Sequence, residues 1–201
     1  MTLRQILAGP VLEAAPALLG RLLVSDIGGE RTAVVITEVE AYDGANDPAS
    51  HAFRGETPRN GSMFGPAGTL YVYRSYGIHW CMNVTCGVEG VASAVLLRGG
   101  RPVEGLDVMA ARRGRAVGLA DGPGKLCQAL GVTGEHDGVD VLSADSVLRV
   151  EGVVEEGLVV ETTPRVGISR AVERPWRFVV SPPGGGSTPK GGGGRQVGRG
   201  I

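Results

Sequence analysis

The chain is poor in cysteine and in long apolar runs, and each shortage excludes a class of protein. Its three cysteines, Cys81, Cys86 and Cys127, are too few and odd in number for a disulfide framework in 201 residues. No second Cys or His pair at zinc-ligand spacing accompanies Cys81 and Cys86, so we expect no metal and no cofactor. Apolar runs such as 33–36 and 94–97 are far shorter than the roughly 18 residues that a membrane span needs. No basic segment followed by an apolar one opens the sequence, so we expect a cytoplasmic protein without membrane contact.

The composition is that of one folded domain followed by a glycine-rich tail. Hydrophobic residues make up 42% of the chain and the mean hydropathy is +0.07, values that suit a compact domain with its own core. From residue 182 the sequence reads PPGGGSTPKGGGGRQVGRGI, with nine glycines in twenty residues, and such a segment cannot bury a core. We therefore expect a monomeric domain over 1–181 and a disordered tail over 182–201.

The net charge of −1 conceals an uneven distribution of charge. Residues 1–50 carry −4, 51–115 carry +4, 116–163 carry −7 and 164–201 carry +6. Blocks of this kind can fold into one basic face on a near-neutral protein, or can remain evenly mixed and solvated. The cations are eighteen arginines and only two lysines. Arginine suits bidentate phosphate contacts, although a GC-rich genome produces the same bias.

The spacing of apolar residues predicts an α+β domain with a largely antiparallel sheet. Gly28-Gly29 and Gly77 mark hairpin turns. Residues 43–68 contain Gly, Pro, Asn, Asp and Ser throughout, and a loop of this length is usually functional or disordered. The predicted helices cover 11–20, 104–115 and 125–130, and the predicted strands cover 22–27, 32–42, 69–76, 79–86, 91–98, 147–150, 153–161 and 176–180.

The strand over 32–42 places two carboxylates next to the long loop. Alternation along AVVITEVEAY puts Glu38, Glu40 and Tyr42 on one face, together with apolar neighbours. A carboxylate in that setting, at the end of a strand where a loop begins, is a candidate general base. Acidic residues on solvated strand faces are common, so a solvent-exposed Glu40 is the alternative.

Three of the four tyrosines lie in the run Tyr71-Val72-Tyr73-Arg74-Ser75-Tyr76. Such a supply of aromatic faces suits a pocket for planar bases, and aromatic core packing is the alternative. Tyr76 differs, because a large side chain at an exposed hairpin tip is unfavourable unless it inserts into something.

Further polar candidates are individually weak. His51 can recognise a base or transfer a proton, and it shares its loop with Arg54 and Arg59. Asn83 lies in an otherwise apolar strand, and Arg98 lies at the end of the strand AVLLR.

Taken together, these segments resemble the bacterial members of the alkyladenine (3-methyladenine) DNA glycosylase family. The resemblance runs in order from about residue 5 to 181, and its combination of motifs is far more specific than any single one. The tail lies outside it, and the acidic block over 135–161 is only loosely similar. The matching segments are EVEAY (38–42), SHAFRGETPRNGSMF (50–64), GTLYVYRSYGIHWCMNV (68–84), VLLRGGRPVEGLDVM (95–109), GPGKLCQALG (122–131), RVGISRA (165–171) and RPWRFVV (174–180).

The resemblance implies a single mixed domain with a curved antiparallel sheet, flanking helices and a protruding hairpin that inserts into DNA. It implies that Glu40 activates a water molecule, which Arg98 and a backbone carbonyl of 165–168 help to hold. Tyr76 would fill the gap left in the duplex, and Asn83 would exclude the amino group of normal guanine.

The same resemblance assigns the base pocket. Tyr42 and Tyr73 would stack on the extruded base, and His51 would contact that base or its sugar-phosphate. Supporting or DNA-contacting positions are Tyr71, Arg59, Leu96 and Lys125.

The implied activity is that of a monofunctional DNA N-glycosylase of base excision repair, bound to double-stranded DNA through the minor groove. It would flip out an alkylated or deaminated purine and hydrolyse the glycosidic bond. A Schiff-base lyase step needs an amine, and neither Lys125 nor Lys190 resembles such a nucleophile, so we expect no lyase activity. The other interpretations are a non-catalytic lesion-binding module without an equivalent of Glu40, and an unrelated hydrolase or β-domain whose tyrosines are core.

Overall fold

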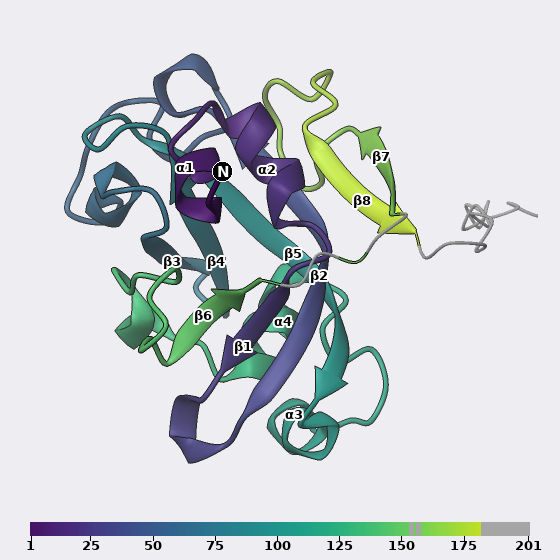
Figure 1. The fold of residues 1–201 in the computed structure, drawn as a ribbon. Helices are drawn as coiled ribbons and strands as arrows, with labels where there is room; N and C mark the ends of the chain where they lie inside the picture. The colour runs from purple at the N-terminus through teal and green to yellow at the C-terminus, as the bar shows by residue number, and fades with distance from the viewer. Residues whose placement is uncertain (153–154, 156–157, 182–201) are drawn as a thin grey trace, which may run out of the picture.

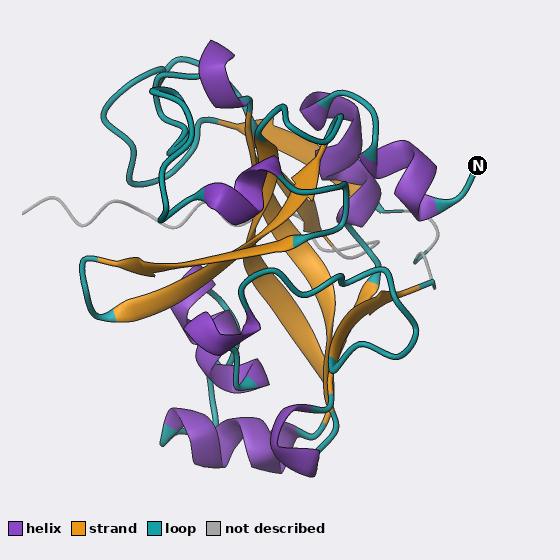
Figure 2. Cartoon of the chain, turned by 90° about the vertical axis from the view of Figure 1, so that its left-hand side faces the viewer, coloured by secondary structure: helices purple, strands orange, loops and turns teal. Residues whose placement is uncertain are grey.

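Strand β2 (Thr32–Tyr42) is the centre of an eight-stranded antiparallel sheet in the computed structural model, which describes residues 1–152, 155 and 158–181. The main path of the sheet is β3-β4-β5-β2-β1-β6, and β8 pairs with β2 and with β7 outside that path. Short helices lie near both ends of the curled sheet (Figures 1 and 2). The α+β class predicted from the sequence is confirmed. The tail expected over 182–201 lies outside the described residues.

Both edges of β2 are paired. On one side, β5 (Ser93–Glu104) pairs with β2 from Ala33 to Tyr42. On the other side, β1 (Leu22–Ser25) pairs with the first part of β2 and β8 (Arg177–Ser181) pairs with Glu38–Glu40. The part of β2 that carries the two carboxylates is therefore fixed between β5 and β8.

Strands β3 (Leu70–Ser75) and β4 (His79–Cys86) pair from Leu70 opposite Val84 to Ser75 opposite His79. The turn between them contains Tyr76 and Gly77, both with positive φ, and the Ile78 N–H donates a hydrogen bond to the Ser75 carbonyl at 3.0 Å. Positive φ at both central residues is the geometry that fits the twist of paired strands. Figure 2 shows these two strands and their turn extending from the rest of the sheet.

Several predicted boundaries were wrong by a few residues. Helix α1 (Leu3–Leu7) was missed, although Thr2 and Gln5 form a capping box at its start. Strand β5 continues to Glu104 where we expected it to end at residue 98, because Gly99, Gly100 and Pro102 are weak strand formers that pairing with β2 nevertheless holds. Of the strand expected over 153–161, the structure describes the part from Val159 onward, and 153–154 and 156–157 lie outside the described residues. The remaining elements are α2 (Val11–Leu18), α3 (Leu106–Arg113), α4 (Pro123–Leu130), β6 (Leu148–Glu151), β7 (Val159–Thr163) and short 3-10 turns at Ile27–Gly29, Gly44–Asn46, Gly61–Phe64 and Gly134–His136.

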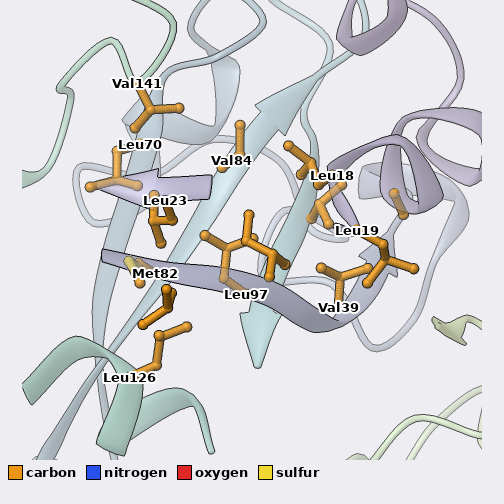
Figure 3. Close-up of a cluster of buried hydrophobic side chains, with 14 of the residues drawn as sticks. Leu18, Leu19, Leu23, Val39, Leu70, Met82, Val84, Leu97, Leu126 and Val141 are labelled. Atoms are coloured by element: carbon orange, nitrogen blue, oxygen red, sulfur yellow. The ribbon is translucent and has the colours of Figure 1, made fainter. Parts of the chain in front are cut away.

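The main hydrophobic core fills the space between the sheet and helices α2 and α4 (Figure 3). Helix α2 contributes Leu18, the sheet contributes Val39, Met82 and Leu97, and α4 contributes Leu126. Val39 lies between Glu38 and Glu40 in sequence, so its burial in the core directs both carboxylates to the opposite face.

A second, smaller cluster holds the 43–68 loop against that opposite face. It contains Ala52 and Met63 from the loop, Tyr71 from β3, and Ala92 and Ala94 from the start of β5. Phe64 and Tyr73 pack against it. The long loop is therefore anchored by apolar contacts on the side of the sheet that carries Glu40.

Gly44 provides a test of how tightly this loop is held. Its φ is +44°, and an added Cβ would lie 1.8 Å from the carbonyl oxygen of Ala92. Gly55 also has a positive φ, +94°, but an added Cβ would meet nothing within 4 Å. We expect Gly44→Ala to lower the free energy of unfolding by about 3 kcal/mol or more, and Gly55→Ala by about 1–2 kcal/mol, the cost of the backbone conformation alone. Urea denaturation of both variants measures the difference, and equal losses would contradict the proposed close contact.

Candidate active site

A cavity of about 680 Å³ opens on the face of the sheet opposite the main core. Its walls come from the end of β2, the β3–β4 hairpin, β5, the 43–68 loop and the segment 166–170. A volume of this size holds a small molecule or a single nucleotide base. The sequence-predicted residues that line it are Tyr42, His51, Arg59, Tyr71, Tyr73, Tyr76, Asn83, Leu96 and Arg98.

Glu40 is completely buried directly beneath the cavity wall. Its Oε1 accepts a hydrogen bond from the Val166 N–H at 2.8 Å, and its Oε2 accepts one from the Tyr42 hydroxyl at 2.9 Å. The Nε of Arg98 lies 3.3 Å from Oε1. Tyr42, Arg98 and Val166 all line the cavity, so the residues that cover Glu40 are themselves pocket residues. The alternative of a solvent-exposed Glu40 was wrong.

Arg98 lies at an irregularity in the pairing of β2 with β5. Glu38 pairs with Gly99 and Val39 pairs with Leu97, so Arg98 is the extra residue of a bulge. The expectation that Arg98 ends its strand was therefore wrong. A bulge changes the direction of a side chain, and here the Nε of Arg98 donates a hydrogen bond to Glu38 Oε1 at 2.7 Å.

Three aromatic side chains gather on the hairpin side of the cavity. The Tyr71 and Tyr73 rings are stacked at 5.6 Å, and His51 meets the Tyr73 ring edge-on at 4.5 Å. Nδ1 of His51 lies 3.0 Å from the Tyr71 hydroxyl, within hydrogen-bond distance. Tyr71 belongs to the smaller apolar cluster, whereas Tyr73 is half-buried and His51 is exposed. Tyr71 thus belongs both to a core cluster and to the cavity wall, and Tyr73 packs against that cluster while it lines the cavity.

These aromatic groups are uncharged at neutral pH. Burial raises the pKa of Tyr71 to about 12, and it raises the pKa values of Tyr42 and Tyr73 further, with the Glu40 charge adding to the effect. Partial burial, followed by the charge of Arg59, lowers the pKa of His51 below its ordinary value. The cavity therefore presents neutral aromatic surfaces next to an acidic group.

A buried ion pair fixes the segment that supplies the Val166 amide. Both side chains are 0% exposed, and Arg165 contacts the two carboxylate oxygens of Asp47 with Nη1 at 2.5 Å and Nη2 at 2.9 Å. Nη1 also donates to the Ala41 carbonyl at 2.9 Å, and the guanidinium lies 4.6 Å from the centre of the Tyr42 ring. Arg165 thereby joins its own segment to the end of β2 and to the start of the 43–68 loop, about 120 positions earlier in the sequence.

The other predicted residues divide between the cavity and the surface. The Asn83 side-chain amide donates to the Tyr71 carbonyl at 3.2 Å, and Leu96 pairs with Glu40 across the β2–β5 ladder. Arg59 is exposed and donates to the Arg74 carbonyl at 3.3 Å. Lys125 is not among the cavity residues, and its Nζ forms an exposed ion pair with Asp121 at 2.9 Å.

Tyr76 is the most unusual residue of the site. Its side chain is 91% exposed and its φ is +48°. A bulky residue in the left-handed region is strained, and strain of this kind concentrates at functional sites. Tyr76 also contributes to the cavity rim. The structure therefore confirms that Tyr76 lies at an exposed hairpin tip.

A fully buried carboxylate beside a cavity lined by tyrosines agrees with what sequence comparison finds. A family model described as methylpurine-DNA glycosylase matches residues 5–183. The chain belongs to the methylpurine-DNA glycosylase family. The members of this family are DNA glycosylases, which are hydrolases that act in DNA base excision repair, and their substrate is DNA.

Relatives of this glycosylase occur in several bacteria. A protein of Agrobacterium fabrum is 51% identical over 170 residues, 83% of this chain and 82% of its own length. One from Rhodopseudomonas palustris (strain HaA2) is 50% identical, covering 87% of this chain and 84% of its own. One from Mycobacterium leprae (strain TN) is 46% identical, with coverage of 87% and 82%. Each is provisionally named a 3-methyladenine DNA glycosylase.

Sequence reasoning missed several residues in and around the cavity. Glu38 shares the face of Glu40 at a spacing of two, so alternation signalled its place but not its two arginine partners. Asp47 and Arg165 carried no local signal, because they meet across 118 positions of the chain. The segment 165–168 was expected to present a carbonyl to a water molecule, and the contact found is the Val166 N–H to Glu40. Further cavity residues that we did not single out are Pro48, Ala49, Ser50, Met63, Cys81, Pro123, Ser169 and Arg170.

Two features are absent from the described residues: a cluster of metal ligands and a membrane-spanning helix. Within residues 1–152, 155 and 158–181, no group of three or more His, Cys, Asp or Glu side chains is placed to hold a metal ion. No helix of that same part of the chain is long and apolar enough to cross a membrane.

The Asp47–Arg165 pair predicts a large stability effect. Burial by itself raises the pKa of Asp47, but hydrogen bonds from Arg165 and from the Ala49 N–H outweigh it, and the pKa lies below its ordinary value. Asp47→Asn leaves the Arg165 charge buried and unpaired, so we expect a loss of about 3–5 kcal/mol in the free energy of unfolding. Lys125→Gln, which removes an exposed pair, is the control and should cost about 0.5 kcal/mol or less.

The pH dependence of stability tests whether this effect depends on the charge of Asp47. A carboxyl whose pKa is lowered by folding contributes stability above its unfolded pKa, and that contribution is lost as the pH falls through the folded value. The difference in stability between wild type and Asp47→Asn should therefore be constant at neutral pH and should shrink below about pH 4. Urea denaturation of both proteins, at neutral pH and at pH values below about 4, measures this difference in stability. A difference that is the same at all pH values would show that Asp47 acts without its charge.

The strain at Tyr76 predicts an increase in stability on substitution. Asn tolerates positive φ better than Tyr, so Tyr76→Asn should raise the free energy of unfolding by about 1 kcal/mol, or the melting temperature by about 2–4 °C. Ile78→Asn is the matched control, since Ile78 is 68% exposed in the same turn without a positive φ. We expect no gain there. A destabilised Tyr76→Asn variant would mean that the Tyr76 side chain stabilises the free protein.

Proposed function

We propose that this chain is a monofunctional DNA N-glycosylase that removes alkylated or deaminated purines from double-stranded DNA in a bacterial cytoplasm. The damaged nucleotide rotates out of the duplex into the cavity, and a water molecule displaces the base from C1′, leaving an abasic site. The proposed lesions are 3-methyladenine, and with it 7-methylguanine, hypoxanthine and ethenoadenine.

The observation that carries this proposal is the fully buried Glu40 beneath an aromatic cavity. Cleavage of a glycosidic bond passes through an oxocarbenium-like sugar, which a nearby carboxylate stabilises while it also takes a proton from the attacking water. Two hydrogen bonds and Arg98 hold the Glu40 carboxylate in place. The water would bind between Tyr42, Arg98 and Val166, the three cavity residues that contact Glu40.

The aromatic residues account for base recognition. Tyr42 and Tyr73 offer faces for stacking, and His51 closes the same side of the cavity. Because these groups are neutral at pH 7, an alkylated purine that carries a positive charge meets no repulsion from them and gains a cation–π attraction. Tyr71 and Leu96 support this wall, and Asn83, which lines the cavity, would exclude the amino group of guanine.

Exposed residues around the cavity account for DNA binding. Rotating a nucleotide out of the stack costs a few kcal/mol, and the exposed Tyr76 side chain would offset part of this cost by filling the gap from the minor groove. Arg59, Arg74 and Arg170 lie at the cavity and are exposed, so they can contact phosphates even though the net charge of the chain is −1. Lys125, outside the cavity, is a further candidate for DNA contact. The proposed enzyme acts as a monomer.

The scarcity of lysine separates this mechanism from a lyase. A β-lyase forms a Schiff base between an amine and C1′. Lys125 does not line the cavity, and Lys190 lies outside the described residues. Water is therefore the proposed nucleophile.

The test is a single-turnover assay on duplexes that each hold one 3-methyladenine, hypoxanthine or ethenoadenine. We expect wild type to release at least one of these bases, and Glu40→Gln to be slower by at least about 100-fold because the general base is lost. Glu40→Gln should still bind the lesion duplex. The product strand should remain intact until alkali cleaves the abasic site.

Three outcomes contradict the proposal in different ways. If both proteins bind lesion DNA and neither excises a base, the chain is a lesion-binding module. If Glu40→Gln is as active as wild type, Glu40 is not the base. Strand cleavage before alkali treatment would mean that a lyase step takes place.

A further inference from the structure

Beside Glu40 lies a second carboxylate, Glu38, which is shared by two arginines. Its Oε1 accepts hydrogen bonds from the Nε of Arg98 at 2.7 Å and from the Nε of Arg177 at 2.6 Å. Arg177 also donates to the Thr163 hydroxyl at 2.9 Å. The Glu38 side chain is only 20% exposed, and those of Arg98 and Arg177 are 13% and 24% exposed.

The sheet register brings these four charges together. Arg177 on β8 pairs directly with Glu40, and its side chain reaches diagonally along β2 to Glu38. From the other side, the β5 bulge places the Nε of Arg98 2.7 Å from Glu38 Oε1 and 3.3 Å from Glu40 Oε1. Two carboxylates and two guanidinium groups thus form a balanced set on one face of the sheet.

Within the described residues, Nε is the only side-chain atom of Arg98 that donates a hydrogen bond to the protein. The Nε group has a single proton and faces two carboxylates, and the shorter contact is with Glu38. The two terminal nitrogens are therefore left for the cavity that Arg98 lines.

We propose that Glu38, held by Arg177, is a positioning residue that keeps Arg98 from forming a closed ion pair with Glu40. This inference rests on the proposed function, in which Glu40 is the general base. Because Glu38 accepts the hydrogen bond from the Nε of Arg98, the terminal nitrogens of Arg98 are directed toward the water site. The Glu40 carboxylate is then left free to act as a base. Arg177 holds Glu38 in this place and neutralises its charge.

The pKa values of the partners agree with this arrangement. Burial raises the pKa of Glu38, but its bonds with Arg177 and Arg98 outweigh burial and the pKa lies below its ordinary value. Burial lowers the pKa of Arg98, but the charge of Glu40 and the contact with Glu38 outweigh it and the pKa is raised. Glu38 and Arg98 are therefore both charged at neutral pH.

The other titratable groups near Glu40 are the same in all the variants compared. Tyr42 on β2 and Tyr73 on β3 have raised pKa values and stay protonated. Arg165, which acts on Glu40 through its charge, is paired with Asp47, whose pKa is lowered. His51 lines the same cavity against Tyr73 and has a lowered pKa, so it contributes to the acidic limb of the rate profile in every variant. A difference in midpoint between variants therefore reports on Glu38, Arg98 and Arg177.

The proposal predicts pH shifts of opposite sign for two substitutions. Glu38→Gln removes a negative charge and releases Arg98 to Glu40, which favours the ionised carboxylate. We expect the acidic midpoint of the single-turnover rate to move down by about 0.5–1 pH unit and the plateau rate to fall about 10-fold, because the base is weaker and Arg98 is turned from the water. Arg177→Gln removes a positive charge, so the midpoint should move up by a similar amount.

The assay uses a duplex with one hypoxanthine, or one 3-methyladenine if hypoxanthine is not excised, over the full pH range in which wild type is folded. The double variant Glu38→Gln/Arg177→Gln should return the midpoint to near the wild-type value. Matched controls are Glu104→Gln and Arg31→Gln, an exposed ion pair of 3.1 Å at the other end of β2, which should leave the midpoint unchanged. Melting temperatures show that each variant is folded.

The outcomes separate this inference from the function on which it rests. If wild type excises no base, or Glu40→Gln stays active, the proposed function fails. If wild type is active and depends on Glu40, but Glu38→Gln and Arg177→Gln leave the midpoint in place or move it in the same direction, the positioning role of Glu38 is overturned. Slower rates with unchanged midpoints would identify both residues as merely structural.

Discussion

Removing the Glu40 carboxylate from water deprives an ionised group of its hydration, and groups from distant parts of the chain have to replace it. Tyr42 comes from the same strand, Arg98 from β5, and the Val166 N–H from a segment more than a hundred positions away. Each of these replaces one contact with water, and each also lines the cavity. The residues that bury Glu40 thus also form part of the cavity wall.

The supports behind these groups follow from that constraint. Val166 reaches Glu40 only because Arg165 is anchored to Asp47 and to the Ala41 carbonyl. Arg98 faces Glu40 only because a bulge in β5 turns it from the regular pairing. A buried ion pair is weak support for stability by itself, since desolvation offsets much of its Coulomb energy. Its value here lies in fixing where the 165–170 segment meets β2.

The two faces of β2 divide stability from function. Val39 and Ala41 belong to the main core, whereas Tyr42 lines the cavity and Glu40 is buried behind the cavity residues Tyr42, Arg98 and Val166. Pairing with β5 on one edge and with β8 on the other fixes this part of the strand. Strain is found instead at the hairpin tip, where Tyr76 adopts a positive φ and is exposed. A rigid site for chemistry and a strained tip for contact with DNA suit the proposed function.

By itself, the sequence determined the α+β class and the order of most elements, because these depend on local periodicity and turn residues. Strict alternation along β2 was only partly right: it grouped Glu38, Glu40 and Tyr42, but it also put Val34 and Ile36 on their face. Both lie in the main core with Val39 and Ala41, because an irregularity in the pairing at Thr37 shifts the phase of the strand. It also contained the motifs that place the chain in its family. Tertiary structure alone decided that Glu40 is buried, that Glu38 is shared by Arg98 and Arg177, and that Arg165 meets Asp47. The bulge at Arg98 and the extension of β5 to Glu104 were equally hidden. Such features arise from pairing between segments distant in the chain, where the energy of burial and charge compensation overrides what neighbouring residues prefer.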